Sequence, residues 1–412
     1  MEKHTQTLYS APWVLPITSP AIQNGAVAVK DGHIKAVGPA AEIRAGFGGL
    51  KEIRCQGVLM PALVNAHIHL ELSHLTAIKR PAEGQKMCTW IEDLIRARGD
   101  CGLAAQERED YRQRALRDQH LSGVILLADI GNEPYSSNPD CPDLPLVLHF
   151  QEFLAPTRQA TQAATAALEG LPDFVAATAH APYSTSPELI CALKHRATRL
   201  GKVFSLHVAE SPEEIEFLRS AAGSFRDFLE RLGAWDATFS PGGNDLDGTV
   251  MYLKKLGVLD SKTLCVHCVY ITEKEMQVLK AKGAHVCLCP GSNRFLRVGK
   301  APVEGMLRHG LLPSLGTDSI ASNETLDLWR EMQILREEHP DVDPARILEM
   351  ATLGGAAALQ YEDDFGSLSP QRKAVFLEVN SERFDQVATE KELVDILTRK
   401  GRPQEVSWIG CR

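Results

Sequence analysis

Short apolar runs alternate with longer amphipathic stretches through most of this chain of 412 residues. Such an alternation of strand and helix is typical of a parallel sheet, and eight repeats predict a (β/α)8 TIM barrel. A doubly wound sheet is the alternative, but no Gly-x-Gly-x-x-Gly motif follows the first run. The eight runs are 58–71, 124–129, 146–150, 174–180, 203–207, 264–267, 285–289 and 312–318.

The two ends of the chain follow a different pattern. Short β-like runs separated by turn residues fill 7–55, and Asp31-Gly32 between two of them predicts a hairpin. The segment 375–379 is again strand-like. We therefore expect an α/β protein whose barrel carries a small β-sandwich domain built from both chain ends. The predicted boundaries are 1–56 and 363–412 for the small domain and 57–362 for the barrel.

The composition excludes several classes of partner. The net charge of −9 and the absence of basic runs argue against a nucleic-acid-binding surface. No apolar run reaches the length of a membrane span, and residues 1–20 lack the apolar core of a signal peptide. The sequence predicts a cytoplasmic protein with a small-molecule substrate, no nucleic-acid partner and no membrane contact, and it leaves a homo-oligomer open.

A pair of histidines stands near the end of the first run. Side chains on a strand alternate between faces, so His67, His69 and Glu71 are predicted to point the same way. Two imidazoles with a carboxylate just beyond them make half of a divalent-metal site. A His-x-His pair is a weak signal by itself, and its interpretation depends on ligands supplied by other runs.

Polar residues at the ends of other runs supply those ligands. In a barrel, the chemistry lies at the carboxyl ends of the strands. His180, His207, His267 and Asp318 all stand at or near such ends. Three imidazoles and one carboxylate leave room for a water molecule and suit zinc, with ferrous iron as the alternative. The predicted metal ligands are His67, His69, His207 and Asp318.

The remaining strand-end residues are candidates for catalysis. A zinc-type ion lowers the pKa of bound water to about 7. Glu210 comes three residues after His207, close enough to move protons between the water and a substrate. His267 could orient the water or stabilise negative charge. The fourth run ends at His180 with neither a lysine nor an acid to bridge two ions, so one metal ion per chain is predicted.

Together these segments resemble the amidohydrolase superfamily in its mononuclear deaminase branch. The resemblance implies hydrolytic deamination of an aminated heterocycle with release of ammonia. It also implies that Glu210 shuttles the proton, that His267 lies beside the attacking water, and that Asp318 both binds the metal and accepts a proton. The segment 371–376 departs from the pattern common in the superfamily. The matching segments are 63–69, 180–184, 207–211, 289–293, 315–319 and 351–356.

Within that branch, residues 69–74 are similar to the deaminases that convert 6-amino-6-deoxyfutalosine to futalosine in menaquinone biosynthesis. The similarity implies that Glu71 contacts the substrate and that His180 hydrogen-bonds near the purine or the leaving amine. Further candidates for substrate contact are Ser186 and Asn293, together with Arg294 or Arg297, which could pair with a substrate carboxylate.

Other functions remain open at this stage. The same metal ligands would serve a deaminase of S-adenosylhomocysteine, methylthioadenosine, guanine, cytosine or a triazine. Hydrolysis of a cyclic amide is a further alternative, which more often uses two metal ions. A non-catalytic barrel scaffold is the remote alternative, because such relatives typically lose metal ligands that are all present here.

Overall fold

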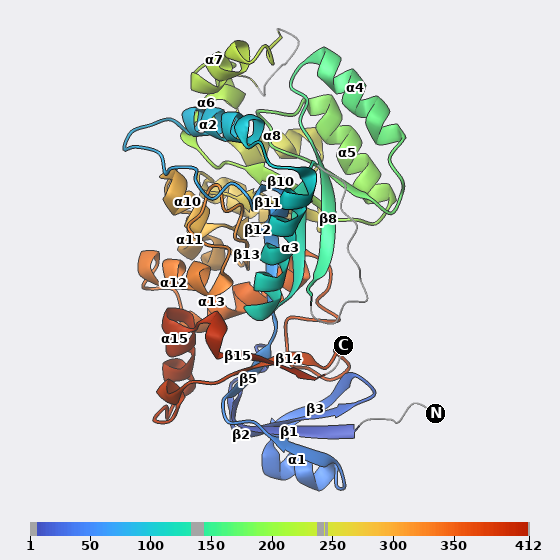
Figure 1. Ribbon diagram of the computed structural model, residues 1–412, viewed down its shortest axis with the longest axis vertical. Coiled ribbons are helices and arrows are strands. Elements are labelled where there is room, and N and C mark those ends of the chain that lie inside the picture. Colours follow the sequence, from blue (N-terminus) through green and yellow to red (C-terminus); the bar gives the residue numbers. More distant parts are fainter. Residues whose placement is uncertain (1–5, 133–143, 237–242, 244–245, 411–412) are drawn as a thin grey trace.

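The computed structural model describes residues 6–132, 144–236, 243 and 246–410. The fold is mixed α/β, with two four-stranded parallel sheets in the larger part of the molecule (Figure 1). One sheet has the order β6 (Leu63–Ile68), β7 (Val124–Gly131), β8 (Leu146–Phe153), β9 (Ala176–Ala179). The other has the order β10 (Phe204–Val208), β11 (Thr263–His267), β12 (His285–Leu288), β13 (Ser314–Leu315).

Helices follow most of these strands and cover them, which explains why the strands are apolar along their length. Several helices begin at a serine or aspartate followed by proline, a pairing that caps the first turn and presets its backbone. These helices are α2 (Met87–Asp100), α3 (Ala105–Leu121), α4 (Arg158–Glu169), α5 (Pro187–Arg199), α6 (Pro212–Ser220), α7 (Ser224–Arg231), α8 (Thr249–Leu256), α9 (Glu273–Lys282), α10 (Pro290–Leu296), α11 (Val303–Arg308), α12 (Leu328–Glu338), α13 (Pro344–Glu349) and α14 (Gly355–Ala358).

A separate seven-stranded sheet is built from both ends of the chain, as the sequence predicts. The predicted hairpin is confirmed, because Lys30 pairs with His33 across a turn in which Asp31 and Gly32 have positive φ angles. The strands form one hydrogen-bonded sheet, and the two packed layers of a sandwich stay a prediction. The elements of this part are β1 (Gln6–Val14), β2 (Ile22–Lys30), β3 (His33–Pro39), β4 (Lys51–Arg54), β5 (Val58–Pro61), β14 (Val375–Val379), β15 (Val406–Gly410) and α1 (Ala40–Gly46). Helix α15 (Glu390–Lys400) comes from the same end of the chain but packs against α12 and α13.

The first apolar run, 58–71, differs from its prediction as one strand. Its first four residues form β5, which pairs with β14 in the seven-stranded sheet, and β6 begins only at Leu63. Glu71 then lies in a 3₁₀ turn, Leu70–Leu72, rather than in the strand. Both strands are fully buried, so the run is apolar throughout, and the sequence gives no sign that the pairing partner changes.

The two parallel sheets meet at the end of the molecule that holds the polar strand ends. The backbone nitrogen of Asp318 donates to the carbonyl oxygen of His67 at 3.1 Å, and that of His207 donates to His180 at 2.9 Å. Gly316 permits this approach, because a Cβ atom there would lie 2.8 Å from the Cβ of His67. No helix in the described ranges is long and apolar enough to span a bilayer.

Candidate active site

Four side chains from the two parallel sheets converge where their strands end. One donor atom from each of the four lies within 4.8 Å of the others. The Nε2 atoms of His69 and His207 both lie 3.1 Å from the Nε2 atom of His67. The Oδ1 atom of Asp318 lies 3.5 Å from His69 Nε2. The structure therefore brings together all four residues predicted as metal ligands.

The contacts among the three imidazoles cannot all be hydrogen bonds. The Nδ1 atom of His207 lies 2.9 Å from the carbonyl oxygen of His180 and must donate to it, so Nε2 of this neutral ring presents a lone pair. That lone pair faces His67 Nε2, which also faces His69. A cation between the three nitrogens removes the conflict, and ligands of one tetrahedral zinc ion lie roughly 3.3 Å apart.

The charge state of the ligands also fits a metal ion. Burial lowers the pKa of His67 to about 4 and lowers that of His207 well below its ordinary value. Both rings are therefore neutral at neutral pH, which is the form that binds metal. Neutral imidazole nitrogens and one carboxylate oxygen form a donor set that suits zinc or ferrous iron.

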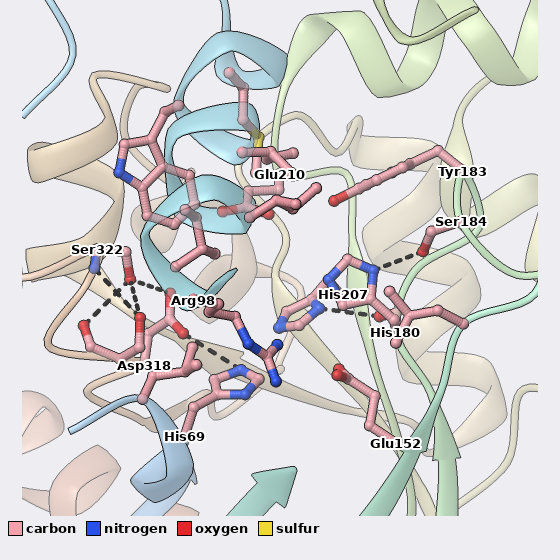
Figure 2. A pocket seen from close by; sticks show the side chains of 18 of the residues that line it. His69, Arg98, Glu152, His180, Tyr183, Ser184, His207, Glu210, Asp318 and Ser322 are labelled. Carbon is pink, nitrogen blue, oxygen red and sulfur yellow. Dashed lines mark hydrogen bonds and ion pairs between the residues drawn. The ribbon is translucent and has the colours of Figure 1, made fainter. Parts of the chain in front are cut away.

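Two hydroxyl groups fix the orientation of the Asp318 carboxylate. Ser322 Oγ donates to Asp318 Oδ2 at 2.8 Å (Figure 2). Ser292 Oγ donates to the same oxygen at 2.6 Å. The other oxygen, Oδ1, is directed toward His67 and His69. Both serines are buried, so each donor–acceptor pair satisfies groups that water does not reach.

Glu210 and His267 lie together beside the metal-ligand set. Glu210 Oε1 is 3.5 Å from His267 Nε2, and both side chains are buried. Burial raises the pKa of Glu210 well above its usual range, with the charge of Asp318 adding to the effect. Asn293 Oδ1 accepts a hydrogen bond from His267 Nδ1 at 2.9 Å, which directs the lone pair of Nε2 toward the site.

Left-handed backbone conformations occur at three of the strand ends that carry these residues. Ala209, His267 and Asp318 have φ angles of 51°, 71° and 56°. Non-glycine residues rarely adopt this conformation, and such strain gathers at functional sites. Glu214 holds the first of these turns, because its carboxylate accepts hydrogen bonds from the backbone nitrogens of Ala209 and Glu210 at 2.8 and 3.0 Å.

A buried glutamate behind the site joins two of the loops. Glu331 in α12 accepts hydrogen bonds from the backbone nitrogen of Gly291 at 2.6 Å and from Asn323 Nδ2 at 2.8 Å. Asn323 Nδ2 also donates to the carbonyl oxygen of Thr317, next to Asp318. Glu331 thereby connects the start of α10, which carries Ser292 and Asn293, to the loop that carries Asp318.

A cavity of about 300 Å³ opens in front of the ligand set. Its inner end is polar and contains the predicted residue His180, beside His207 (Figure 2), and the predicted residue Glu71 also lines the cavity. Its outer wall is apolar and comes mainly from α2 and from α7 with the segment after it. We call this outer surface the helix wall, and it consists of Met87, Trp90, Ile91, Leu94, Ile95, Phe228, Leu229, Leu232 and Ala234.

Two charged residues in the cavity were missed by the sequence reasoning. Arg98 in α2 is the only lysine or arginine among the described residues that line the cavity, and it donates to Glu71 Oε1 at 3.1 Å. Glu152 lies at the end of β8, which extends three residues beyond the predicted run 146–150. The strand-end rule would have found Glu152 had the strand end been placed correctly. No local signal marks Arg98, because it lies in a helix.

The other predicted substrate contacts lie away from the cavity lining. Ser186 caps α5 and accepts from the backbone nitrogen of Leu189. Asn293 is behind His267, as described above. Arg294 pairs with Glu337 and Glu338 at 2.6 and 2.8 Å, and Arg297 ends α10 in a left-handed conformation. His180 does line the cavity, with its Nδ1 atom 2.6 Å from Ser184 Oγ.

The family model of the amidohydrolase family matches residues 58–406 of the chain. A short second match, to an imidazolonepropionase-like composite domain of bacteria, covers 25–47. The 5-methylthioadenosine/S-adenosylhomocysteine deaminase of Moorella thermoacetica is 30% identical over 382 residues, covering 88% of this chain and 82% of that protein. The protein of the same name from Syntrophobacter fumaroxidans is 28% identical, with coverage of 86% and 80%.

Solved structures with the same fold extend over nearly the whole chain. Aminofutalosine deaminase of Helicobacter pylori, in complex with methylthio-coformycin, superposes with a TM-score of 0.82 at 24% identity, covering 97% of both chains. An adenosine deaminase from Xanthomonas campestris with bound zinc gives a TM-score of 0.74 at 23% identity, covering 97% of this chain and 90% of the other. At these identities the likeness shows the fold.

Proposed function

Because the chain belongs to the deaminase branch of the amidohydrolase family, as a hydrolase of C–N bonds other than peptide bonds, we propose that it deaminates an aminopurine nucleoside. The observation that carries the proposal is the convergence of four metal-ligand donors beside the Glu210–His267 pair at the inner end of a ligand-sized cavity. Cavities of this kind, with a few convergent polar groups and perturbed pKa values, are typical of active sites.

Each residue of the site has a task in that reaction. His67, His69, His207 and Asp318 would hold one divalent ion, zinc by preference, and such an ion makes water acidic enough to act as a nucleophile at neutral pH. Glu210, whose raised pKa favours its protonated form, would protonate the ring nitrogen beside the amine-bearing carbon. The His267 Nε2 lone pair would accept a hydrogen bond from the attacking water.

The shape of the cavity supports a nucleoside over a free base. The polar inner end is followed by the helix wall, which a single base such as guanine or cytosine would leave uncovered. A nucleoside with an apolar substituent would bury that wall, at about 25 cal/mol for each Å² removed from water. The polar residues Glu71 and Arg98, which are hydrogen-bonded to each other, also line the cavity and would contact the sugar.

We propose 6-amino-6-deoxyfutalosine as the substrate, converted to futalosine and ammonia in menaquinone biosynthesis. In support, Glu71 of the 69–74 segment lies in the cavity, and Arg98 offers a guanidinium for a benzoate-like carboxylate on the substrate. The second candidate is 5′-methylthioadenosine or S-adenosylhomocysteine, which the names of the relatives favour. The helix wall suits a methylthio group equally well.

Three further features belong to the same proposal. We propose that the two parallel sheets make one (β/α)8 barrel over 57–362, supported by the backbone bonds at both junctions between the sheets. The small domain would then comprise 1–56 and 363–412, supported by the sheet that both chain ends share. A cytoplasmic location, a homo-oligomeric state and the absence of nucleic-acid and membrane partners stay predictions.

Ammonia release tests the function directly. The substrates are 6-amino-6-deoxyfutalosine, 5′-methylthioadenosine, S-adenosylhomocysteine, adenosine and guanine, used with protein of measured metal content. We expect turnover of an adenine nucleoside with one metal ion per chain, loss of activity on chelation, and recovery with zinc. Turnover of guanine alone would overturn the nucleoside assignment. Turnover of 5′-methylthioadenosine without that of the first substrate would establish the second candidate.

A further inference from the structure

Glu152 is a buried carboxylate in the wall of the cavity, and nothing in the proposed chemistry uses it. It is 8% exposed, and its Oε1 atom has no hydrogen-bond partner within the described part of the chain. Its Oε2 atom lies 3.4 Å from the Nδ2 atom of Asn132, which is a long contact. A buried carboxylate with so few hydrogen bonds costs free energy, so its place in the cavity lining favours a donor from a bound molecule.

The surroundings of Glu152 place its ionisation near neutral pH. Burial raises its pKa to about 7, the imidazole of His69 and the guanidinium of Arg98 lower it, and the carboxylate of Glu71 raises it. The group can therefore accept a hydrogen bond in its charged form or exchange one in its neutral form. A hydroxyl group, which both donates and accepts, suits either form.

Glu152 lies across the site from Glu210, with one carboxylate oxygen within 4.8 Å of a ring nitrogen of both His180 and His207. In Figure 2, Glu210 lies on one side of the His180–His207 pair and Glu152 on the other. Glu210 is the residue placed to protonate the ring nitrogen beside the reacting carbon. The far side of the purine, which carries the sugar, would then be the part directed toward Glu152.

A second carboxylate lies next to Glu152. The backbone nitrogen of Asn132 donates to Glu71 Oε2 at 2.7 Å, and the side-chain amide of the same residue lies against Glu152. The two carboxylates thus flank one residue, Glu71 from the 3₁₀ turn after β6 and Glu152 from the end of β8. Two adjacent acceptors match the two adjacent hydroxyls of a ribose.

We propose that Glu152 is a substrate-binding residue that hydrogen-bonds a ribose hydroxyl and thereby selects ribonucleosides over deoxyribonucleosides. The proposal rests on the proposed function for the orientation of the purine. The proposal narrows the substrate class to ribonucleosides, because a free base or a deoxyribose would leave the buried Glu152 carboxylate without that donor.

The test combines substitutions of Glu152 with substrates that lack one ribose hydroxyl. Wild type, Glu152→Gln and Glu152→Ala are each assayed for kcat/KM with adenosine, 2′-deoxyadenosine and 3′-deoxyadenosine. Wild type should prefer adenosine over one deoxy analogue by about 10- to 100-fold, the range for a hydrogen bond to a charged group. Glu152→Ala should have nearly the same kcat/KM for adenosine and for that deoxy analogue. Glu152→Gln should show a preference between those of wild type and Glu152→Ala. An unchanged preference in both variants would overturn the proposal.

Glu275→Gln is the matched control, because Glu275 is also a fully buried glutamate but does not line the cavity. It should keep the wild-type preference for the hydroxyl. Metal content is measured on every variant and should stay at the wild-type level. A fall in metal content in Glu152→Gln would assign Glu152 to the metal, with His180 and His207 as its neighbours, and would overturn the sugar contact.

A binding measurement separates this proposal from the proposed function. Calorimetric titration with inosine, 2′-deoxyinosine and 3′-deoxyinosine needs no turnover. A hydroxyl preference in binding that Glu152→Ala removes would support the sugar contact even if no nucleoside were deaminated, in which case only the proposed reaction would fail. Binding without any such preference would overturn the role of Glu152, whatever the activity.

Discussion

The cavity has two walls that are constructed differently. At the strand ends, the functional side chains are held by hydrogen bonds. Ser292 and Ser322 hold Asp318, and Asn293 holds His267. The helix wall consists of apolar side chains from α2 and α7, which an exposed ion pair between Arg231 and Glu92 joins at 2.5 Å.

The difference separates two properties of the protein. Hydrogen bonds are directional, so the strand-end wall fixes individual atoms as a proton-transfer reaction requires. Apolar contact is non-directional, so an apolar wall discriminates between substrates mainly by their size and shape. One methylene group more or less usually changes kcat/KM by a factor of about 10 to 200. We infer that the strand ends determine the reaction and that the helix wall determines which substituent the substrate carries.

The largest expected effect comes from disabling the strand-end wall. Glu210→Gln should retain the metal and lower kcat by about 10²- to 10⁴-fold, because an amide cannot give and take the proton. Metal analysis measures the metal content of the variant, and ammonia release measures its kcat. Glu213→Gln is the control, since this neighbouring glutamate pairs with Lys86 at 3.3 Å outside the cavity. Turnover of the Glu210 variant close to wild type would remove Glu210 from the mechanism.

A smaller effect, on KM, should show which of two arginines binds a substrate carboxylate. Arg98→Met should raise KM for a carboxylate-bearing nucleoside by about 10- to 100-fold relative to adenosine, because a charge-assisted hydrogen bond is lost. Arg294→Met serves as the comparison and should leave that ratio unchanged, because Arg294 does not line the cavity and pairs with Glu337 and Glu338. The reverse outcome would restore Arg294 as the carboxylate partner.

Shortening one side chain should test the helix wall. Leu94→Ala removes apolar contact in α2 and should raise KM for 5′-methylthioadenosine by about 10-fold, with little change in kcat for adenosine. Leu121→Ala in α3 removes the same atoms from an exposed position outside this cavity, so it should change neither constant. Equal losses on both substrates would mean that the wall supports the fold rather than the substituent.

A further prediction concerns the free energy of unfolding and its dependence on pH. Burial raises the pKa of Glu331 to about 8, so the folded state holds a proton that the unfolded state has released above its pKa of 4.5. Stability conferred by this protonation is present below pH 4.5 and is lost as pH rises through 8. Relative to Glu331→Gln, the free energy of unfolding of wild type should therefore fall by at most about 1.4 kcal/mol per pH unit between these two pKa values. Denaturant unfolding of both proteins at several pH values measures the free energy of unfolding. If this free energy changed with pH in the same way for wild type and Glu331→Gln, the raised pKa of Glu331 would be contradicted.

Much of the site could be predicted from residues at the ends of apolar runs. His67, His207 and Asp318 fall where parallel strands end, and parallel strands in one sheet end at the same edge. The same rule missed Glu152 because β8 continues past its apolar part into polar residues. The family resemblance suggests Asn293 as a candidate for substrate contact, and in the structure its oxygen accepts a hydrogen bond from His267.

The fold shows the same division. The change of sheet between β5 and β6 could not be predicted, because a strand buried on both faces is apolar whichever neighbour it pairs with. Arg98 and the helix wall were also beyond prediction, since they reach the cavity from α2 and α7, distant in sequence from the strand ends.

The sequence by itself determined the chemistry of this protein, because ligand type and strand periodicity are local properties that a single segment displays. The tertiary structure decided which carboxylates hold other side chains and which face the cavity, and it decided which helices line the cavity. Those choices depend on contacts between residues far apart in the chain, such as Glu71 with Arg98 and Asn293 with His267, and no local pattern records them.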